Sequence, residues 1–152
     1  MSFDHREQVK NILQLISVTK DDGVATASLI VMYEGGPENL KHLFYVNDFD
    51  AVITIERPRT RESGDGKRIQ DEPLRYDASV PVNVCAVNRT GVTAAKLLNK
   101  IRLAIEGIVE AMAQRATFTL IVETGEPRNT VMGGYDPLWF DRYVFRYRPM
   151  VS

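Results

Sequence analysis

The residues of this chain that could do chemistry are few and scattered. Its two histidines, His5 and His42, stand apart from other ligands, whereas a metal site needs several donors converging from fixed elements. The single cysteine, Cys85, is a lone thiol in a predicted strand, and a nucleophilic cysteine needs a base and surroundings that lower its pKa. We therefore expect no metal, no cofactor and no catalytic residue. Cys85 is interpreted as a small packing residue, under a helix or facing a partner.

Two short motifs resemble known sites without completing them. Glu34 beside Gly35 and Gly36 lacks the lysine and the Ser or Thr of a phosphate-binding loop. Asn88-Arg89-Thr90 matches a glycosylation sequon, but we interpret it as a turn in which Thr90 caps a following helix. Neither motif predicts a functional site.

The acidic residues leave an enzyme open only as the lowest-ranked hypothesis. Glu106 and Glu110 share one face of a predicted helix, where a solvated surface is favoured over an acid/base pair. A hypothetical enzyme would use acids scattered along the chain, namely Glu34, Asp48, Asp50 and Glu56. Such scattered acids are typical of any protein surface.

Arginines and aromatic residues alternate near the end of the chain. The segment consists of Arg142, Tyr143, Val144, Phe145, Arg146, Tyr147 and Arg148, and Val144 is its one residue of another kind. Such a strand could bind nucleic acid through charge and stacking. The formal net charge of −1 and the lack of a nucleic-acid signature favour instead an edge strand guarded by charges.

The overall composition predicts an ordinary soluble protein. The 152 residues are 44% hydrophobic and 26% charged, which indicates one domain spanning 1–152 with a real core. One cysteine excludes an internal disulfide and fits a reducing compartment. The polar start, Met1 to Lys10, does not resemble a secretory signal, and no apolar run approaches the roughly 18 residues of a membrane span. We expect an intracellular protein outside the membrane.

The stretch from Arg75 to Ala113 organises the predicted fold. Alternating residues from Tyr76 to Val87 predict a strand with one buried face. From Gly91 to Ala113, apolar residues recur every three or four positions, which predicts an amphipathic helix.

Shorter elements surround this pair. We predict a helix at Asp4–Val18, strands at Ala25–Tyr33 and Asp50–Arg57, an inner strand at Thr117–Thr124 and a terminal strand at Leu138–Tyr147, while Asn39–Val46 suits either a helical turn or a strand. The sum is an α+β fold, in which a mostly antiparallel sheet carries an N-terminal helix and one long packed helix.

Residues 58–73 form the most polar segment of the chain. Its charged residues are Arg59, Arg61, Glu62, Asp65, Lys67, Arg68, Asp71 and Glu72. Such a segment cannot bury enough apolar surface to order itself, so it predicts a long exposed loop or the tip of a projecting hairpin. Loops of this length are often functional or disordered, and both remain open.

Taken together, this order of elements resembles that of the tail terminator, or tail-completion, proteins of tailed viruses. The likeness rests on the alternating strand Tyr76 to Val87, the helix segment Ala94 to Ile105, and the ending Tyr135-Asp136-Pro137-Leu138-Trp139-Phe140 with its closing strand. It implies a structural virion subunit of the tail or neck, made in the host cytoplasm, that forms a ring, typically a hexamer. Tail-tube and head-tail connector proteins are its implied neighbours, and no catalytic residues carry over.

A ring subunit needs sheet edges and a loop that pair with the next copy. The terminal strand with Arg142 and Arg146, and the charged loop from Arg59 to Asp71, are the candidate interface segments. The alternative is a small cellular α+β domain that binds a ligand or nucleic acid through the loop Gly125–Pro137 and the terminal strand. We expect neither membrane binding nor sequence-specific nucleic-acid binding.

Overall fold

The computed structural model describes residues 5–34, 43–44, 48–62, 76–112, 118–122, 128–130 and 138–147. The elements in chain order are α1 (His5–Leu13), β1 (Leu29–Tyr33), β2 (Ala51–Ile55), β3 (Arg59–Glu62), β4 (Tyr76–Val87), α3 (Ala94–Met112), β5 (Phe118–Val122), β6 (Arg128–Thr130) and β7 (Leu138–Tyr147). This is the predicted α+β class. In the described part, neither helix has the length and apolar character that a membrane crossing requires.

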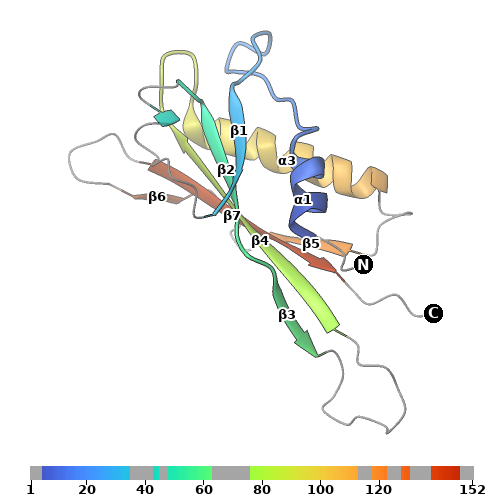
Figure 1. Ribbon diagram of the computed structural model, residues 1–152. Coiled ribbons are helices and arrows are strands. Elements are labelled where there is room, and N and C mark those ends of the chain that lie inside the picture. Colours follow the sequence, from blue (N-terminus) through green and yellow to red (C-terminus); the bar gives the residue numbers. More distant parts are fainter. Residues whose placement is uncertain are drawn as a thin grey trace, which may run out of the picture.

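The described strands form one sheet of seven strands (Figure 1). Its main order is β1-β2-β4-β7-β5, with β3 beside β4 and β6 beside β7. β1 and β2 run parallel, and every other neighbouring pair runs antiparallel. The prediction of a mostly antiparallel sheet is therefore confirmed.

β4 is the strand around which the sheet is built. The alternation seen in the sequence places Val80, Val82 and Val84 fully buried on one face, while Cys85 and Val87 are buried on the other. One edge of β4 pairs with β2 and β3. The opposite edge, from Ala78 to Val87, pairs with the whole of β7. Burial on both faces accounts for the valine-rich sequence of β4, while its polar residues Ser79 and Asn83 are only half-buried.

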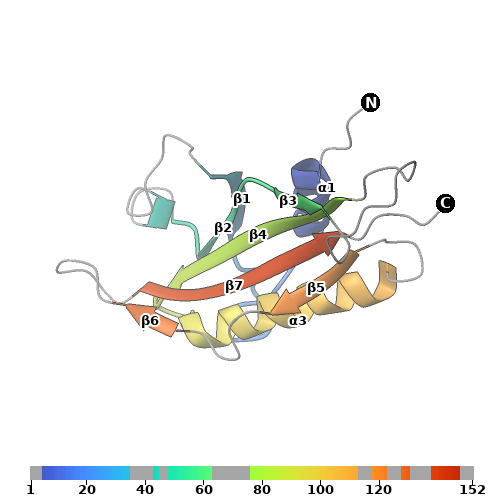
Figure 2. The ribbon, with the colours of Figure 1, turned by 90° about the horizontal axis from the view of Figure 1, so that it is seen from below.

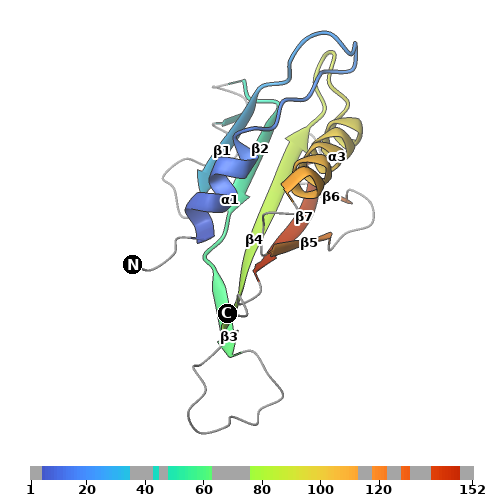
Figure 3. The ribbon, with the colours of Figure 1, turned by 90° about the vertical axis from the view of Figure 1, so that its right-hand side faces the viewer.

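Both helices cover the same face of the sheet (Figures 2 and 3). α1 contacts β1, β2 and β4, whereas α3 contacts β4, β5 and β7. The apolar stripe of α3 is buried as its period predicts, through Leu97, Leu98, Ile101 and Ile105. Burying each such side chain contributes roughly 1.5–3 kcal/mol, so this stripe is a main source of stability.

The N-terminal helix is shorter than the predicted Asp4–Val18. α1 ends at Leu13, and the next amides bond three residues back, from Leu15 to the Ile12 carbonyl and from Ile16 to the Leu13 carbonyl. This tighter turn ends the helix and redirects the chain, so that Val18 packs into the core instead of continuing the helix.

A second apolar cluster lies on the opposite face of the sheet. It consists of Leu43, Phe44, Val52, Cys85, Val87 and Leu138. Leu43 and Phe44 are helical and fully buried, which resolves part of the ambiguous segment Asn39–Val46 in favour of a helical turn. The rest of that segment lies outside the described residues.

Two predictions about sheet edges are wrong. The C-terminal strand β7, expected at an edge, lies inside the sheet between β4 on one side and β5 and β6 on the other. β5, expected as an inner strand, ends the strand order. The period of a strand reports which face is buried, but it carries no information on which strands lie beside it.

The polar segment 58–73 begins as a strand and extends a hairpin from the sheet. β3 pairs antiparallel with the start of β4, from Arg59↔Ser79 to Glu62↔Tyr76. Figures 1 and 3 show this hairpin projecting away from the two helices. We call β3 with the paired residues Tyr76–Ser79 the hairpin arm. The arm leads into the segment predicted as a loop or a hairpin tip, and that segment, residues 63–75, lies outside the described part.

Candidate functional site

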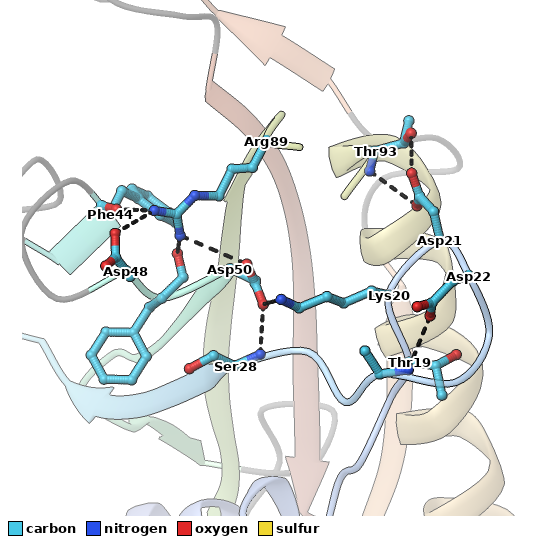
Figure 4. A network of polar contacts seen from close by, with 12 residues as sticks. Thr19, Lys20, Asp21, Asp22, Ser28, Phe44, Asp48, Asp50, Arg89 and Thr93 are labelled. Atoms are coloured by element: carbon cyan, nitrogen blue, oxygen red, sulfur yellow. Dashed lines mark hydrogen bonds and ion pairs between the residues drawn. The ribbon is translucent and has the colours of Figure 1, made fainter. Parts of the chain in front are cut away.

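The largest polar network in the described chain centres on Arg89, in the turn between β4 and α3 (Figure 4). Its guanidinium donates from Nη1 to the Phe49 carbonyl at 2.7 Å and from Nη2 to the Phe44 carbonyl at 2.7 Å. Nη2 also donates to Asp48 Oδ1 at 2.9 Å, and Nη1 lies 3.7 Å from Asp50 Oδ1. The planar guanidinium of Arg89 thus holds Phe44 and residues 48–50, which directly precede β2.

Asp50 is the buried charge of this network, with a side chain only 5% exposed. Its Oδ2 accepts a 2.7 Å hydrogen bond from the Ser28 amide just before β1, and Lys20 Nζ lies 4.0 Å away. A carboxylate removed from water requires such partners, and Arg89 and Lys20 supply the opposite charge. Asp50 therefore ties the starts of the parallel strands β1 and β2 to the end of β4.

A second group of contacts holds the start of α3. Asp21 accepts hydrogen bonds from the Thr93 amide at 3.0 Å and the Thr93 hydroxyl at 2.7 Å, and these contacts lower the pKa of Asp21. Asn88 Oδ1 accepts from the Ala94 amide at 2.8 Å. The predicted helix start at Gly91 and the Thr90 cap are wrong, because the first free amides of the helix are met by Asp21 and Asn88 around Thr93.

Lys100 connects the same loop to the middle of α3. Its ammonium donates to the Lys20 carbonyl at 2.8 Å and to the Thr19 carbonyl at 3.0 Å. Asp22 in turn accepts from the amides of Val24 and Ala25, which lowers the pKa of Asp22. The loop from Thr19 to Ala25 is therefore held by the helix and by its own turn.

This network is suited to holding segments together and not to catalysis. The hydrogen bonds of Arg89 and Asp50 each join a charged group to the backbone or to an opposite charge. Of the acids proposed for an enzyme, Asp48 and Asp50 meet at Arg89, Glu56 lies in a different network, and Glu34 is exposed after β1. No group of residues in the described ranges could hold a metal ion.

Neither a scan against protein-family models nor a search of curated proteins finds a match to this chain. The site must be interpreted from its own chemistry.

The second network occupies the sheet face opposite the helices. Arg142 on β7 donates to the Glu56 carboxylate at 2.5 Å and to Asn83 Oδ1 at 3.1 Å, and Asn83 also donates to Glu56 at 2.7 Å. Arg142 and Arg146 do point away from Tyr143 and Phe145, which are fully buried under α3. Phe140 shares the face of the arginines and packs against the second apolar cluster. Arg142, a candidate interface residue, is thus engaged within its own chain.

The remaining interface candidates divide between the hairpin arm and β7. Arg59, Arg61 and Glu62 lie in β3, and the Arg59 side chain is 74% exposed. Arg146 is half-buried on β7. Asp65, Lys67, Arg68 and Asp71 lie outside the described residues. The structure does not bring Arg142 or Arg146 to a sheet edge, because β7 is an inner strand.

Cys85 supplies no reactive site. Cys85 is buried on the face away from the helices, in the second apolar cluster, and burial raises the pKa of its thiol to about 12. It is therefore protonated and inert at neutral pH. His5 begins α1, and His42 lies outside the described residues.

A buried polar pair on β7 escaped the sequence analysis. The Tyr143 hydroxyl donates to Asp141 Oδ2 at 2.7 Å, and both residues are buried under α3. Burial and the Asp141 carboxylate raise the pKa of Tyr143, which keeps the hydroxyl protonated as a donor. The sequence also did not identify Arg89 as the centre of a polar network. Its position between a predicted buried strand and a predicted helix could have indicated this role, because side chains there can reach several elements.

Proposed function

We propose that this chain is a structural subunit of a tailed virus, a tail terminator or neck protein that assembles into a ring joining the tail tube to the head. A homohexamer is the ring size that the family resemblance implies. The neighbours on either side would be tail-tube and head-tail connector proteins. The contacts within the ring are assigned here from the geometry of this chain.

The hairpin arm is the observation that carries the proposal. It extends beyond the part of the sheet that the helices cover (Figure 3), so in an isolated subunit little of the described chain packs against it. Within the described residues β3 pairs only with β4, so its outer edge is available to another chain. An extended two-stranded element is marginal alone and gains stability by docking on a neighbour.

The inner position of β7 narrows the choice of contact surfaces. In the described sheet, the strands with an open edge are β1, β3, β5 and β6. Of these, β3 lies on a projecting element and carries an arginine that is 74% exposed, Arg59. We assign the contact between neighbouring ring subunits to β3 and the charged segment that follows it. Mixed charges there would set the register between identical copies more than the affinity.

The ring test replaces residues 63–73 by a short Gly-Asn turn, which leaves β3 and β4 intact. Wild-type protein should give a discrete closed oligomer in light scattering on a sizing column, with a central hole in negative-stain images. The variant should fall to a smaller species with an unchanged circular dichroism spectrum. A control variant keeps the length of the segment but replaces residues 63–73 by a Gly/Ser sequence. Comparing the two variants distinguishes the effect of removing the charges from the effect of shortening the segment.

Two results would reject the assignment. A ring that survives the replacement would place the contact elsewhere, and a wild-type monomer at all concentrations would remove spontaneous ring formation.

The cellular binding alternative predicts nucleic-acid affinity that falls steeply with salt and with Arg142→Ala plus Arg146→Ala. Engagement of Arg142 by Glu56 and Asn83 weighs against that alternative, because phosphate would have to displace Glu56.

A further inference from the structure

The outward side of α3 carries a stripe that no described element covers. Its exposed members are Lys96, Asn99, Leu103, Glu106, Gly107 and Glu110. Leu103 lies at its centre with 63% of its surface exposed, whereas the stripe that faces the sheet is buried. A large apolar side chain at the middle of an otherwise polar stripe is a candidate contact point.

The charges of this stripe are arranged symmetrically about Leu103 with opposite signs. Lys96 precedes Leu103 by seven residues, and Glu110 follows it by seven. Seven residues are almost two full turns, so all three side chains project to nearly the same side. The N-terminal half of the stripe is basic, and the C-terminal half is acidic.

This arrangement is unfavourable for an isolated helix. Cations are destabilising near a helix N-terminus and anions near a C-terminus, and α3 has no acid in its first turn and no base in its last. Lys96 with Lys100, and Glu106 with Glu110, are like-charge pairs at four-residue spacing, which also lower helix stability. A second α3 helix packed antiparallel would place its acidic half beside the basic half of the first. The opposite charges would then offset both the unfavourable dipole placement and the like-charge repulsion.

We propose that α3 is a docking surface for the α3 helix of a second copy of this chain, packed antiparallel about a two-fold axis at Leu103. Leu103 then meets its own counterpart, Lys96 faces the partner's Glu110, and Glu110 faces the partner's Lys96. One patch serves both copies, which is the definition of an isologous contact. Each positive half covers a negative half, so the surface is complementary to itself.

Gly107 supports a close approach of the two helices. It is exposed one turn after Leu103, and a Cβ built at this position would meet no atom within 4 Å. Glycine inside a helix lowers the stability of that helix relative to alanine, and no contact among the described residues requires a glycine there. In the antiparallel pair Gly107 lies opposite the partner's Asn99, and the missing side chain lets the two helix backbones come close beside Leu103.

This contact is distinct from the ring contact proposed above. A ring joins two different surfaces of neighbouring copies, whereas the two-fold contact joins one surface to itself. α3 and the hairpin arm also lie in different parts of the molecule (Figure 3). A single pair of helices buries less than the roughly 1,600 Å² of a standard interface, so we expect a dimer that dissociates on dilution.

Cross-linking of Leu103→Cys tests the symmetry directly. The buried Cys85 thiol stays silent, so the only reactive thiol lies on the proposed axis, opposite its own copy. Mild oxidation should give a disulfide dimer at least tenfold faster than for Val24→Cys, a control at a loop site that is 84% exposed. Equal rates for the two variants would overturn the proposal.

Charge reversal tests the pairing. In the Leu103→Cys background, Lys96→Glu and Glu110→Lys should each slow the cross-link, since each places like charges opposite one another. The double variant Lys96→Glu/Glu110→Lys should restore it. Each single change improves the match to the helix dipole. Lys96→Glu also removes an attraction to Asp21 at the start of α3, so circular dichroism of each variant must show that the helix is retained. A double variant as slow as the single variants would reject the charge pairing.

Combining the cross-link with the replacement of residues 63–73 separates the two contacts. The ring should be lost while the Leu103→Cys cross-link remains. A cross-link that is lost together with the ring would show that α3 meets its copy only within the ring, and it would overturn the independent two-fold contact.

Discussion

Arg89 joins three parts of the chain through one guanidinium. It meets the carbonyls of Phe44 and Phe49 and the carboxylates of Asp48 and Asp50, although these residues precede it by about forty positions. Its contacts therefore hold Phe44 and residues 48–50 against the turn that follows β4. Such a side chain stabilises the relative position of elements, not one element alone.

Replacing Arg89 should destabilise the fold strongly. Arg89→Ala leaves the buried Asp50 with only the Ser28 amide and the more distant Lys20, so we expect a loss of about 3 kcal/mol, as for other broken buried pairs. Arg89→Lys keeps the charge but loses the planar donors, and about half of that loss is expected. Urea denaturation of both variants measures the effect.

Asp48→Asn is the matched control for this experiment. Asp48 bonds the same guanidinium, but its side chain is 79% exposed, so the change should cost less than about 1 kcal/mol. Asparagine also tolerates the positive φ of 58° at this position. A loss as large as that of Arg89→Ala would mean that Asp50 is not the charge that matters.

Residue types alone could not reveal this network. Arg89 lies within a sequon-like triplet and Asp50 precedes an apolar strand, so each has an ordinary local explanation. Their contact depends on how β1 and β2 are placed, which is a property of the fold. The inert character of Cys85 was predictable, because a lone thiol in an apolar strand is usually a packing residue.

The start of α3 is held by a residue from a distant loop. Asp21 caps the helix through Thr93, and both hydrogen bonds go to its charged form. Asp21→Asn should therefore lower the denaturation midpoint at pH 7. The lowered pKa of Asp21 makes its contribution complete above the ordinary value of 3.8 and lost as the pH falls through the lowered pKa.

Denaturant melts followed by circular dichroism between pH 2 and pH 7 check this dependence. The difference between wild type and Asp21→Asn should shrink towards the acid end of the range. A difference that does not change with pH would mean that the charge of Asp21 is not what holds Thr93.

Elements with a strong period were the most predictable part of the structure. The alternation over Tyr76–Val87 and the helical period of α3 each reflect burial along one element, and sequence records both. The caps at the start of α3 were not predictable, since Asp21 lies more than seventy positions before Thr93. The predicted start at Gly91 is three residues too early because the residue that caps α3, Asp21, comes from this distant loop.

The order of strands predicts how stability is distributed over the whole molecule. β4 and β7 are paired on both edges and contribute fully buried side chains to the main core. Their amides should exchange hydrogen most slowly, with opening free energies close to that of global unfolding. Exchange in β3 should be much faster, because it lies on the projecting arm. Hydrogen exchange read by mass spectrometry measures both.

An amide in β3 that exchanges as slowly as those of β4 would contradict this order in a monomer. Slow exchange in β3 that appears only at high concentration would instead report docking of the arm. The sequence predicted the α+β class, and it left residues 58–73 open between an exposed loop and a projecting hairpin. It misplaced β5 and β7, because the positions of strands within a sheet are set by pairing between distant segments.

The inner position of β7 also bears on synthesis of the protein. Ribosomes make β7 after every other described strand, yet β7 supplies the neighbour that β4, β5 and β6 all require. Until it emerges, the edge of β4 that pairs with β7 stays open, and the main core lacks Tyr143 and Phe145. The sheet can therefore be completed only after β7 has been made, and until then the open edge of β4 favours binding of a chaperone that recognises extended apolar segments.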